Sequence, residues 1–193
     1  MSISRTVGKV AYGVLFVIAI PALLVSWAHR LDRVIPGLPA VGTPAIGWTA
    51  AAVGFAVMAA GWWALVRYGE GLPMNIAPPE RLVTRGIYRF FSQPIYAGFS
   101  LLTAGYFMAA DVPAGFWIVT PCVVLGCATI VYGYERHDMK RRFGATGSPA
   151  LLHFPDAADV RPSRADRVSA YVLVLLPGFA LPKMVLLLGP PPE

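Results

Sequence analysis

Residues 85–98, RGIYRFFSQPIYAG, combine several side chains that could bind a charged ligand, and they stand just before an apolar run. Arg89 can form a bidentate pair with a carboxylate, and the rings of Tyr88 and Tyr96 can stabilise a cation. Polar groups are costly to desolvate at the threshold of a hydrophobic helix. The crowding makes this stretch a candidate site, which the surrounding elements must position.

The composition indicates an integral membrane protein. Of the 193 residues, 56% are hydrophobic and only 13% are charged, and the mean hydropathy is +0.61. A soluble domain carries about 25% charged residues, so this chain has too few to cover a water-exposed surface. We therefore expect an all-α integral membrane protein with a single domain over residues 1–193.

Five apolar runs approach the roughly 20 residues that a helix needs to cross the hydrocarbon layer. They cover residues 8–28, 45–66, 95–110, 113–134 and 168–188, and the third could begin as early as Phe90. Only the residues DVP separate the third run from the fourth, which predicts a tight helical hairpin. The fifth run contains two prolines and Lys183, so either a kinked or an incomplete crossing is expected there.

The distribution of basic residues predicts the orientation. With five spans, the amino-terminal tail and the loops 67–94 and 135–167 share one side, which holds thirteen of the sixteen lysines and arginines. By the positive-inside rule this side is cytoplasmic. The sequence pI of about 9.6 then follows from topology and from attraction to anionic lipid, and a nucleic-acid partner is not needed to explain it.

Two polar loops would lie on the cytoplasmic side. Glycines and prolines within residues 67–94 argue against a continuous helix in the first. The second begins with YERHDMKRRFG, residues 134–144, which predicts a helical continuation of the fourth span ending at Gly144. Residues 145–167 contain further prolines and are expected to form a cytoplasmic loop.

The predicted hairpin would bring the two polar stretches together. Glu135 lies at the end of the fourth span, and Gln93 and Tyr96 lie at the beginning of the third. We therefore expect Glu135 to face Gln93 and Tyr96. Within the fourth span, Cys122 and Cys127 lie about 140° apart on the helix, so they cannot bridge each other and are expected to be buried, reduced thiols.

These motifs resemble those of isoprenylcysteine carboxyl methyltransferases and their bacterial relatives. LVTRGIYRFFSQPIYAG is similar to the family's run of Leu-Val-x-x-Gly-Pro-Tyr-Arg, then Arg-His-Pro or Arg-Asn-Pro, then x-Tyr-x-Gly. GEGLPMNIAPPERLV resembles the connector of many bacterial members, and YERHDMKRRFG resembles their Tyr-Glu-Glu, short spacer, Arg-Phe-Gly ending. The resemblance covers residues 68–144, which would form the methyltransferase-like core.

The resemblance implies methyl transfer from S-adenosylmethionine, held in a cytoplasmic pocket beside the hairpin, to a lipophilic or lipid-anchored acceptor. Arg89 and Glu135 are the expected catalytic residues: Glu135 could attract the sulfonium or ammonium group of the cofactor, and Arg89 could pair with a carboxylate. The positions that match the family as cofactor-binding are Val83, Gly86, Tyr88, Gln93, Pro94, Tyr96, Gly98 and Glu135.

The chain departs from the family pattern at several of these positions. Ser92 and Gln93 replace the usual Arg-His or Arg-Asn, Ile87 replaces a proline, and Arg136 replaces the second acid of the Glu-Glu pair. The loss of one cation and one carboxylate could be a compensated exchange across a single ion pair. It could equally mark a site that has lost catalysis.

Plainer interpretations remain for the same residues. Tyr88 and Arg89 could anchor the membrane interface, and Glu135 could face water among its basic neighbours. His137 diverges from Glu135 on a helix, so a metal site is not expected.

Three functions follow from these observations. The leading hypothesis is an S-adenosylmethionine-dependent methyltransferase of a bacterial inner membrane. An alternative is a non-catalytic subunit of a larger membrane complex, and a third is a sterol-reductase-like NADPH enzyme, although Phe99 stands where those enzymes carry an acid. The acceptor atom stays open, because a carboxylate needs no general base whereas an ammonium-bearing lipid must first lose a proton.

Overall fold

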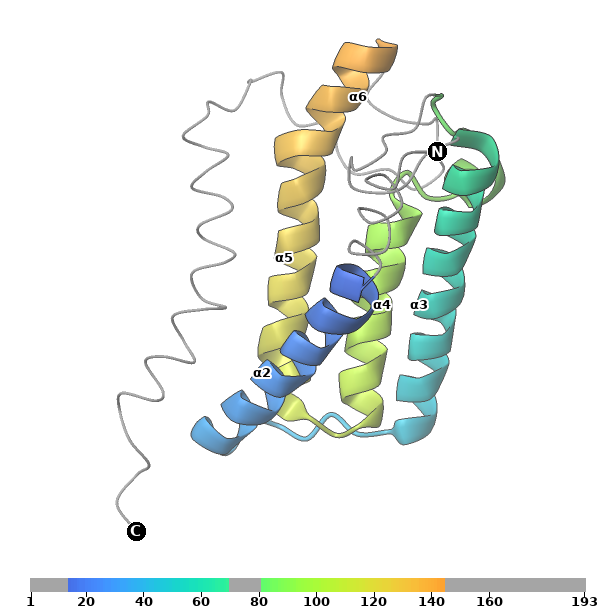
Figure 1. The fold of residues 1–193 in the computed structure, drawn as a ribbon. Helices are drawn as coiled ribbons and strands as arrows, with labels where there is room; N and C mark the ends of the chain where they lie inside the picture. The colour runs from blue at the N-terminus through green and yellow to red at the C-terminus, as the bar shows by residue number, and fades with distance from the viewer. Residues whose placement is uncertain (1–13, 70–80, 145–193) are drawn as a thin grey trace.

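The computed structural model describes residues 14–69 and 81–144, and within these ranges the chain is helical without any strand (Figure 1). In chain order the elements are a π-helical turn Leu15–Ala19, α2 Ile20–Val34, α3 Pro44–Ala64, a π-helical turn Leu65–Gly69, a 3-10 turn Gly86–Arg89, α4 Pro94–Ala109, a π-helical turn Gly115–Val119, α5 Thr120–Ile130, a π-helical turn Val131–Glu135 and α6 Arg136–Phe143. The predicted all-α class is confirmed for the described part of the chain.

Two of the described helices are long and apolar enough to cross a membrane. They are Pro44–Gly69, with 26 residues, and Gly115–Phe143, with 29 residues. These helices correspond to the second and fourth predicted runs, while α2 and α4 coincide with parts of the first and third. The fifth run, 168–188, and the loop 145–167 lie outside the described residues, so the count of five spans stays a prediction.

Helices α3 and α4 pack with their backbones in direct contact along a row of glycines, called here the glycine seam. Its members are Gly47, Gly54 and Gly61 on α3 and Gly98 and Gly105 on α4. A Cβ atom at Gly98 would lie 2.5 Å from the backbone nitrogen of Met58, and one at Gly105 would lie 2.7 Å from the carbonyl oxygen of Gly47. Small residues allow this close approach, which favours helix association in membranes.

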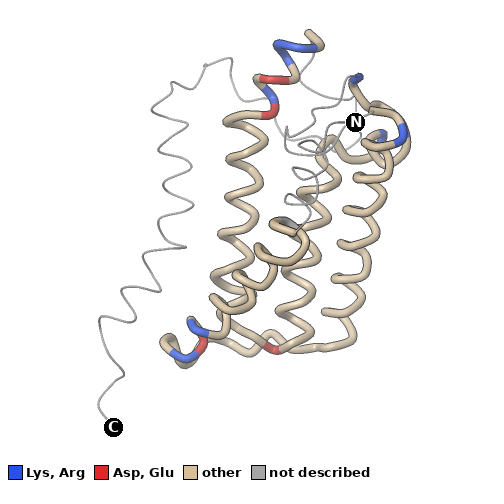
Figure 2. Tube along the Cα trace, viewed as in Figure 1, with Lys and Arg blue, Asp and Glu red and all other residues tan. Residues whose placement is uncertain are grey.

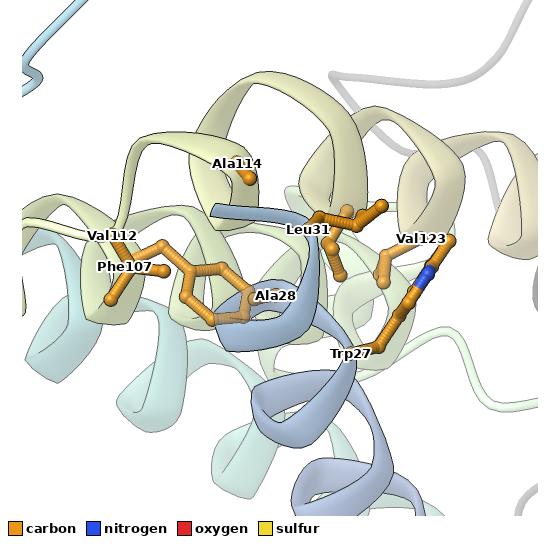
Figure 3. Close-up of a cluster of buried hydrophobic side chains, with 8 residues drawn as sticks. Trp27, Ala28, Leu31, Phe107, Val112, Ala114 and Val123 are labelled. Carbon is orange, nitrogen blue, oxygen red and sulfur yellow. The ribbon is translucent and has the colours of Figure 1, made fainter. Parts of the chain in front are cut away.

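Helix α2 crosses the other helices and packs its apolar face into a buried cluster (Figures 1 and 3). The cluster joins α2 to α4 and to the start of the helix Gly115–Phe143, called here the long helix. Its members are Trp27, Ala28, Leu31, Phe107, Val112, Ala114, Val119 and Val123. Beside it, the Ala114 N–H donates to Asp32 Oδ1 at 2.7 Å. Backbone N–H groups at the beginning of a helix have no carbonyl partner within that helix. The Asp32 carboxylate supplies such a partner for Ala114, next to the start of the helix Gly115–Phe143.

Local sequence explains where several helices begin and end. Pro44 and Pro94 occupy the first positions of α3 and α4, where their missing N–H removes no helical hydrogen bond. Helix α4 therefore starts at Pro94, and the earlier start near Phe90 is wrong because residues before a proline avoid the helical conformation. Gly144 ends α6 with φ of 68°, which confirms the predicted continuation of the long helix and its glycine cap.

The glycine seam predicts that a single methyl group will separate α3 from α4. Gly54→Ala and Gly105→Ala should each lower the free energy of unfolding by about 1–3 kcal/mol, because backbone atoms must move to admit the Cβ. Gly133→Ala is the matched control, since a Cβ there would meet nothing within 4 Å. Unfolding in a denaturing-detergent titration measures the difference, and equal effects at all three positions would contradict the seam.

The contact between Asp32 and the start of the long helix should also contribute to stability. Asp32→Ala removes the acceptor of the Ala114 N–H and should cost about 0.5–2 kcal/mol, as the loss of a helix cap does. Asp32→Asn keeps an acceptor oxygen and should restore most of this loss. Thermal unfolding of the wild-type protein and of both variants measures these differences. Equal stability of the alanine and asparagine variants would contradict a stabilising bond from Ala114 to Asp32.

Candidate functional site

The two polar stretches meet in a hydrogen bond between α4 and the end of the long helix. The hydroxyl of Tyr96 donates to Glu135 Oε1 at 2.5 Å, although 39 residues separate the two in sequence. A short hydrogen bond to a carboxylate is stronger than one between neutral groups. The prediction that Glu135 faces the start of α4 is confirmed. The end of the molecule that carries this pair is called the site end below.

Local structure fixes both members of the pair. Tyr96 is in the first turn of α4, two residues after Pro94, and is only 7% exposed. Glu135 is the last residue of the π-helical turn Val131–Glu135 and is partly buried. The water-exposed interpretation of Glu135 is therefore wrong, because its carboxyl group is turned toward α4. Single π-helical turns inside an α-helix frequently occur at functional sites.

Tyr88 and Val83 belong to a second buried cluster at the site end. They pack with Ala64 and Leu65 at the end of α3. The described residues 81–93, which lead into α4, are called here the connector. Gly86 has φ of 64°, a left-handed conformation that glycine adopts without strain, and it begins the 3-10 turn that carries Tyr88. The connector is thus anchored on α3 by Val83 and Tyr88, and the interface-anchor interpretation of Tyr88 is wrong because the ring is buried in protein.

The Glu135 carboxyl group affects the pKa of Tyr88. Burial raises the pKa of the Tyr88 phenol above its ordinary value, and the negative charge of nearby Glu135 raises it further. The phenol is therefore neutral at physiological pH and can donate a hydrogen bond. Together Tyr88, Tyr96 and Glu135 form an acidic, aromatic centre at the site end.

The other polar residues predicted for the site differ in exposure. Arg89 is exposed at the end of its 3-10 turn, and Gln93 is half-buried. Gln93 precedes α4 and accepts the Ala97 N–H through its main-chain carbonyl, but its side chain makes no cap.

Gly98 and Arg136 have contacts that the motifs did not indicate. Gly98 lies in the glycine seam, so the close approach it permits is to α3, and a place beside a cofactor stays a prediction. The Arg136 guanidinium lies 5.4 Å from the ring centroid of Tyr132, one turn earlier on the same helix. This cation–π contact joins Arg136 to a residue of its own helix.

Cys122 and Cys127, expected to be buried and reduced thiols, lie in α5. Both cysteines are free, as expected, but they are only partly buried.

This set of side chains suits a ligand with both cationic and anionic groups. The Glu135 carboxylate and the buried rings of Tyr88 and Tyr96 belong to the site end, and Arg89 and Gln93 stand between the two tyrosines in the sequence. In residues 14–69 and 81–144, no three His, Cys, Asp or Glu side chains are grouped closely enough to hold a metal ion.

The comparison with known families covers this same region. A family model described as phospholipid methyltransferase matches residues 43–146, slightly more than half of the chain. This family belongs to the isoprenylcysteine carboxyl methyltransferase-like group of membrane methyltransferases, so the resemblance inferred from residues 68–144 is confirmed. No curated protein and no solved structure matches the chain.

The raised pKa of Tyr88 predicts a pH dependence of stability. Above pH 10 the phenol ionises in the unfolded chain but not in the folded one, so the folded state holds one proton more and loses stability as pH rises. The loss should approach about 1.4 kcal/mol per pH unit. Tyr88→Phe should remove this component, and chemical unfolding at pH 8 to 11 measures it. An unchanged slope in the variant would contradict the burial of the phenol beside Glu135.

Proposed function

The chain belongs to the phospholipid methyltransferase family, and from this premise we propose that it transfers a methyl group from S-adenosylmethionine to a lipophilic or lipid-anchored acceptor. The observation that carries the proposal is the hydrogen bond between Tyr96 and Glu135. It gathers a carboxylate, two tyrosines and the start of α4 at one end of apolar helices, where a water-soluble cofactor and a membrane-bound acceptor could both arrive.

The residues present fit this cofactor. Glu135 uses one oxygen for Tyr96 and keeps the capacity to accept from an ammonium group. The rings of Tyr88 and Tyr96 offer π faces to a sulfonium cation, and a neutral Tyr88 adds no negative charge that water would have to solvate. Arg89 would pair with the carboxylate of the cofactor, and Gln93 would bind a polar edge through its amide.

The chain contributes position and desolvation rather than covalent chemistry. When bound, S-adenosylmethionine would supply an electrophilic methyl group and leave as the neutral thioether. Tyr96 on α4 and Glu135 on the long helix would hold it in place, which would reduce the entropy loss of a free encounter with the acceptor. The apolar cluster around Val83 and Tyr88 excludes water on the connector side, which strengthens the attraction between Glu135 and a cation.

The charges of the described residues support a cytoplasmic placement of the site end in a bacterial inner membrane. Eight lysines and arginines lie at the site end, against two arginines at the opposite end (Figure 2). Because cytoplasmic flanks carry the excess of basic residues, this arrangement favours a site that faces the cytoplasm, where S-adenosylmethionine is made available.

Cofactor binding is the first test of the proposal. Isothermal titration of the detergent-solubilised, folded protein with S-adenosylmethionine should give measurable binding. Glu135→Gln and Tyr96→Ala should each weaken it about tenfold or more, since each removes a direct or orienting contact. Asp138→Asn is the control, because it also removes one carboxylate from the same helix but lies three residues further along.

The outcomes separate an enzyme from a non-catalytic relative. If the folded protein does not bind S-adenosylmethionine, the proposal is wrong. The departures from the family pattern at Ser92, Gln93 and Arg136 would then mark a chain that no longer binds the cofactor. Wild-type affinity in both Glu135→Gln and Tyr96→Ala would show that the cofactor lies elsewhere.

A further inference from the structure

The two ends of the described helices differ in net charge (Figure 2). The opposite end carries Arg30 and Arg33 together with Asp32 and Asp111, so its charges balance. At the site end only Glu135 and Asp138 oppose eight lysines and arginines in the described residues. This excess of cations makes the outer surface of the site end positive, and Glu135 is turned inward to Tyr96.

Seven of these basic side chains are exposed, and those other than Arg67 are called here the basic collar. They come from the connector and from α6, and they are Arg81, Arg85, Arg89, Lys140, Arg141 and Arg142. The ion pair between Arg142 and Asp138 is long, at 3.5 Å, and solvent-accessible, so it neutralises little of the positive potential.

The position of the collar along the helix matches the headgroup layer of a membrane. The three basic residues of α6 follow Glu135 by five to seven positions, which is about 8–10 Å along a helix. One headgroup layer is about 5–8 Å thick beyond the hydrocarbon. With Glu135 at the hydrocarbon boundary, Lys140, Arg141 and Arg142 reach the outer edge of that layer, and their long side chains can extend back to lipid phosphates.

We propose that the basic collar binds anionic phospholipids and enriches them in the lipid shell around the site end. Exposed cations within a Debye length of anionic headgroups attract them additively, and arginine matches the geometry of phosphate. The partner is the lipid phosphate in the same bilayer, and the proposal does not depend on methyl transfer. It distinguishes the site end from the opposite end, where acidic and basic residues cancel.

The lipids retained by the protein give a direct test. The protein is reconstituted in vesicles of phosphatidylcholine with about one fifth phosphatidylglycerol, extracted in mild detergent, and its bound lipids are measured by native mass spectrometry. We expect phosphatidylglycerol to be enriched at least about twofold over the vesicle composition, and the enrichment to fall in high salt, which screens exposed charges.

Matched variants localise the effect. R81Q/R85Q and K140Q/R141Q/R142Q should each reduce the enrichment, whereas R30Q/R33Q, which removes two arginines from the opposite end, should leave it unchanged. All of these side chains are exposed, and Arg89 is left intact because it belongs to the proposed site. If the connector variant fails to fold, the α6 variant alone decides.

Three results would overturn the proposal. The first is a retained lipid composition equal to that of the vesicles. The second is a loss of phosphatidylglycerol enrichment in R30Q/R33Q equal to the loss in the collar variants. The third is an enrichment that inorganic phosphate abolishes at constant ionic strength, which would assign the collar to free phosphate. Cofactor titration on the same variants keeps the tests separate, since loss of lipid enrichment with normal S-adenosylmethionine binding concerns the collar alone.

Discussion

Direct backbone contact between α3 and α4 is the constraint on which the site depends. Helices gain little from hiding apolar side chains in a lipid environment, so close packing must hold them together, and glycine permits the closest packing. The α3 glycines recur at seven-residue intervals, as do Gly98 and Gly105, which keeps each set on one helix face. Tyr96 lies about 200° around α4 from Gly98. With one face fixed against α3, α4 presents Tyr96 to the long helix.

The second contact joins that fixed helix to Glu135. Between apolar helices a hydrogen bond to a carboxylate has few competitors, so Tyr96 determines how the carboxyl group is turned. Tyr88 contributes to the centre from the connector and packs against the end of α3. Its position therefore also depends on α3, which the glycine seam holds against α4. The same helix pair therefore supports the site from two directions, through α4 and through the connector.

Helix α2 lies outside the region that matches the phospholipid methyltransferase family, which begins at residue 43. Nevertheless its Asp32 satisfies the first backbone donor near the start of the long helix, and its apolar face completes the cluster shown in Figure 3. The amino-terminal helix of this chain thus steadies the helix that carries Glu135, from the end opposite the site. The family core and this additional helix share one packing unit in the described residues.

The sequence by itself determined the helical class, the end of α6 at Gly144 and the meeting of Glu135 with Tyr96. These features follow from hydrophobic length, from the backbone freedom of glycine, and from a short connection between two helices. Only the tertiary structure decided that Gly98 faces α3, that Asp32 reaches Ala114 and that Tyr88 is buried beside Glu135. Those contacts join segments far apart in the chain, and their partners depend on how helices are rotated about their axes, which residue spacing alone leaves undetermined.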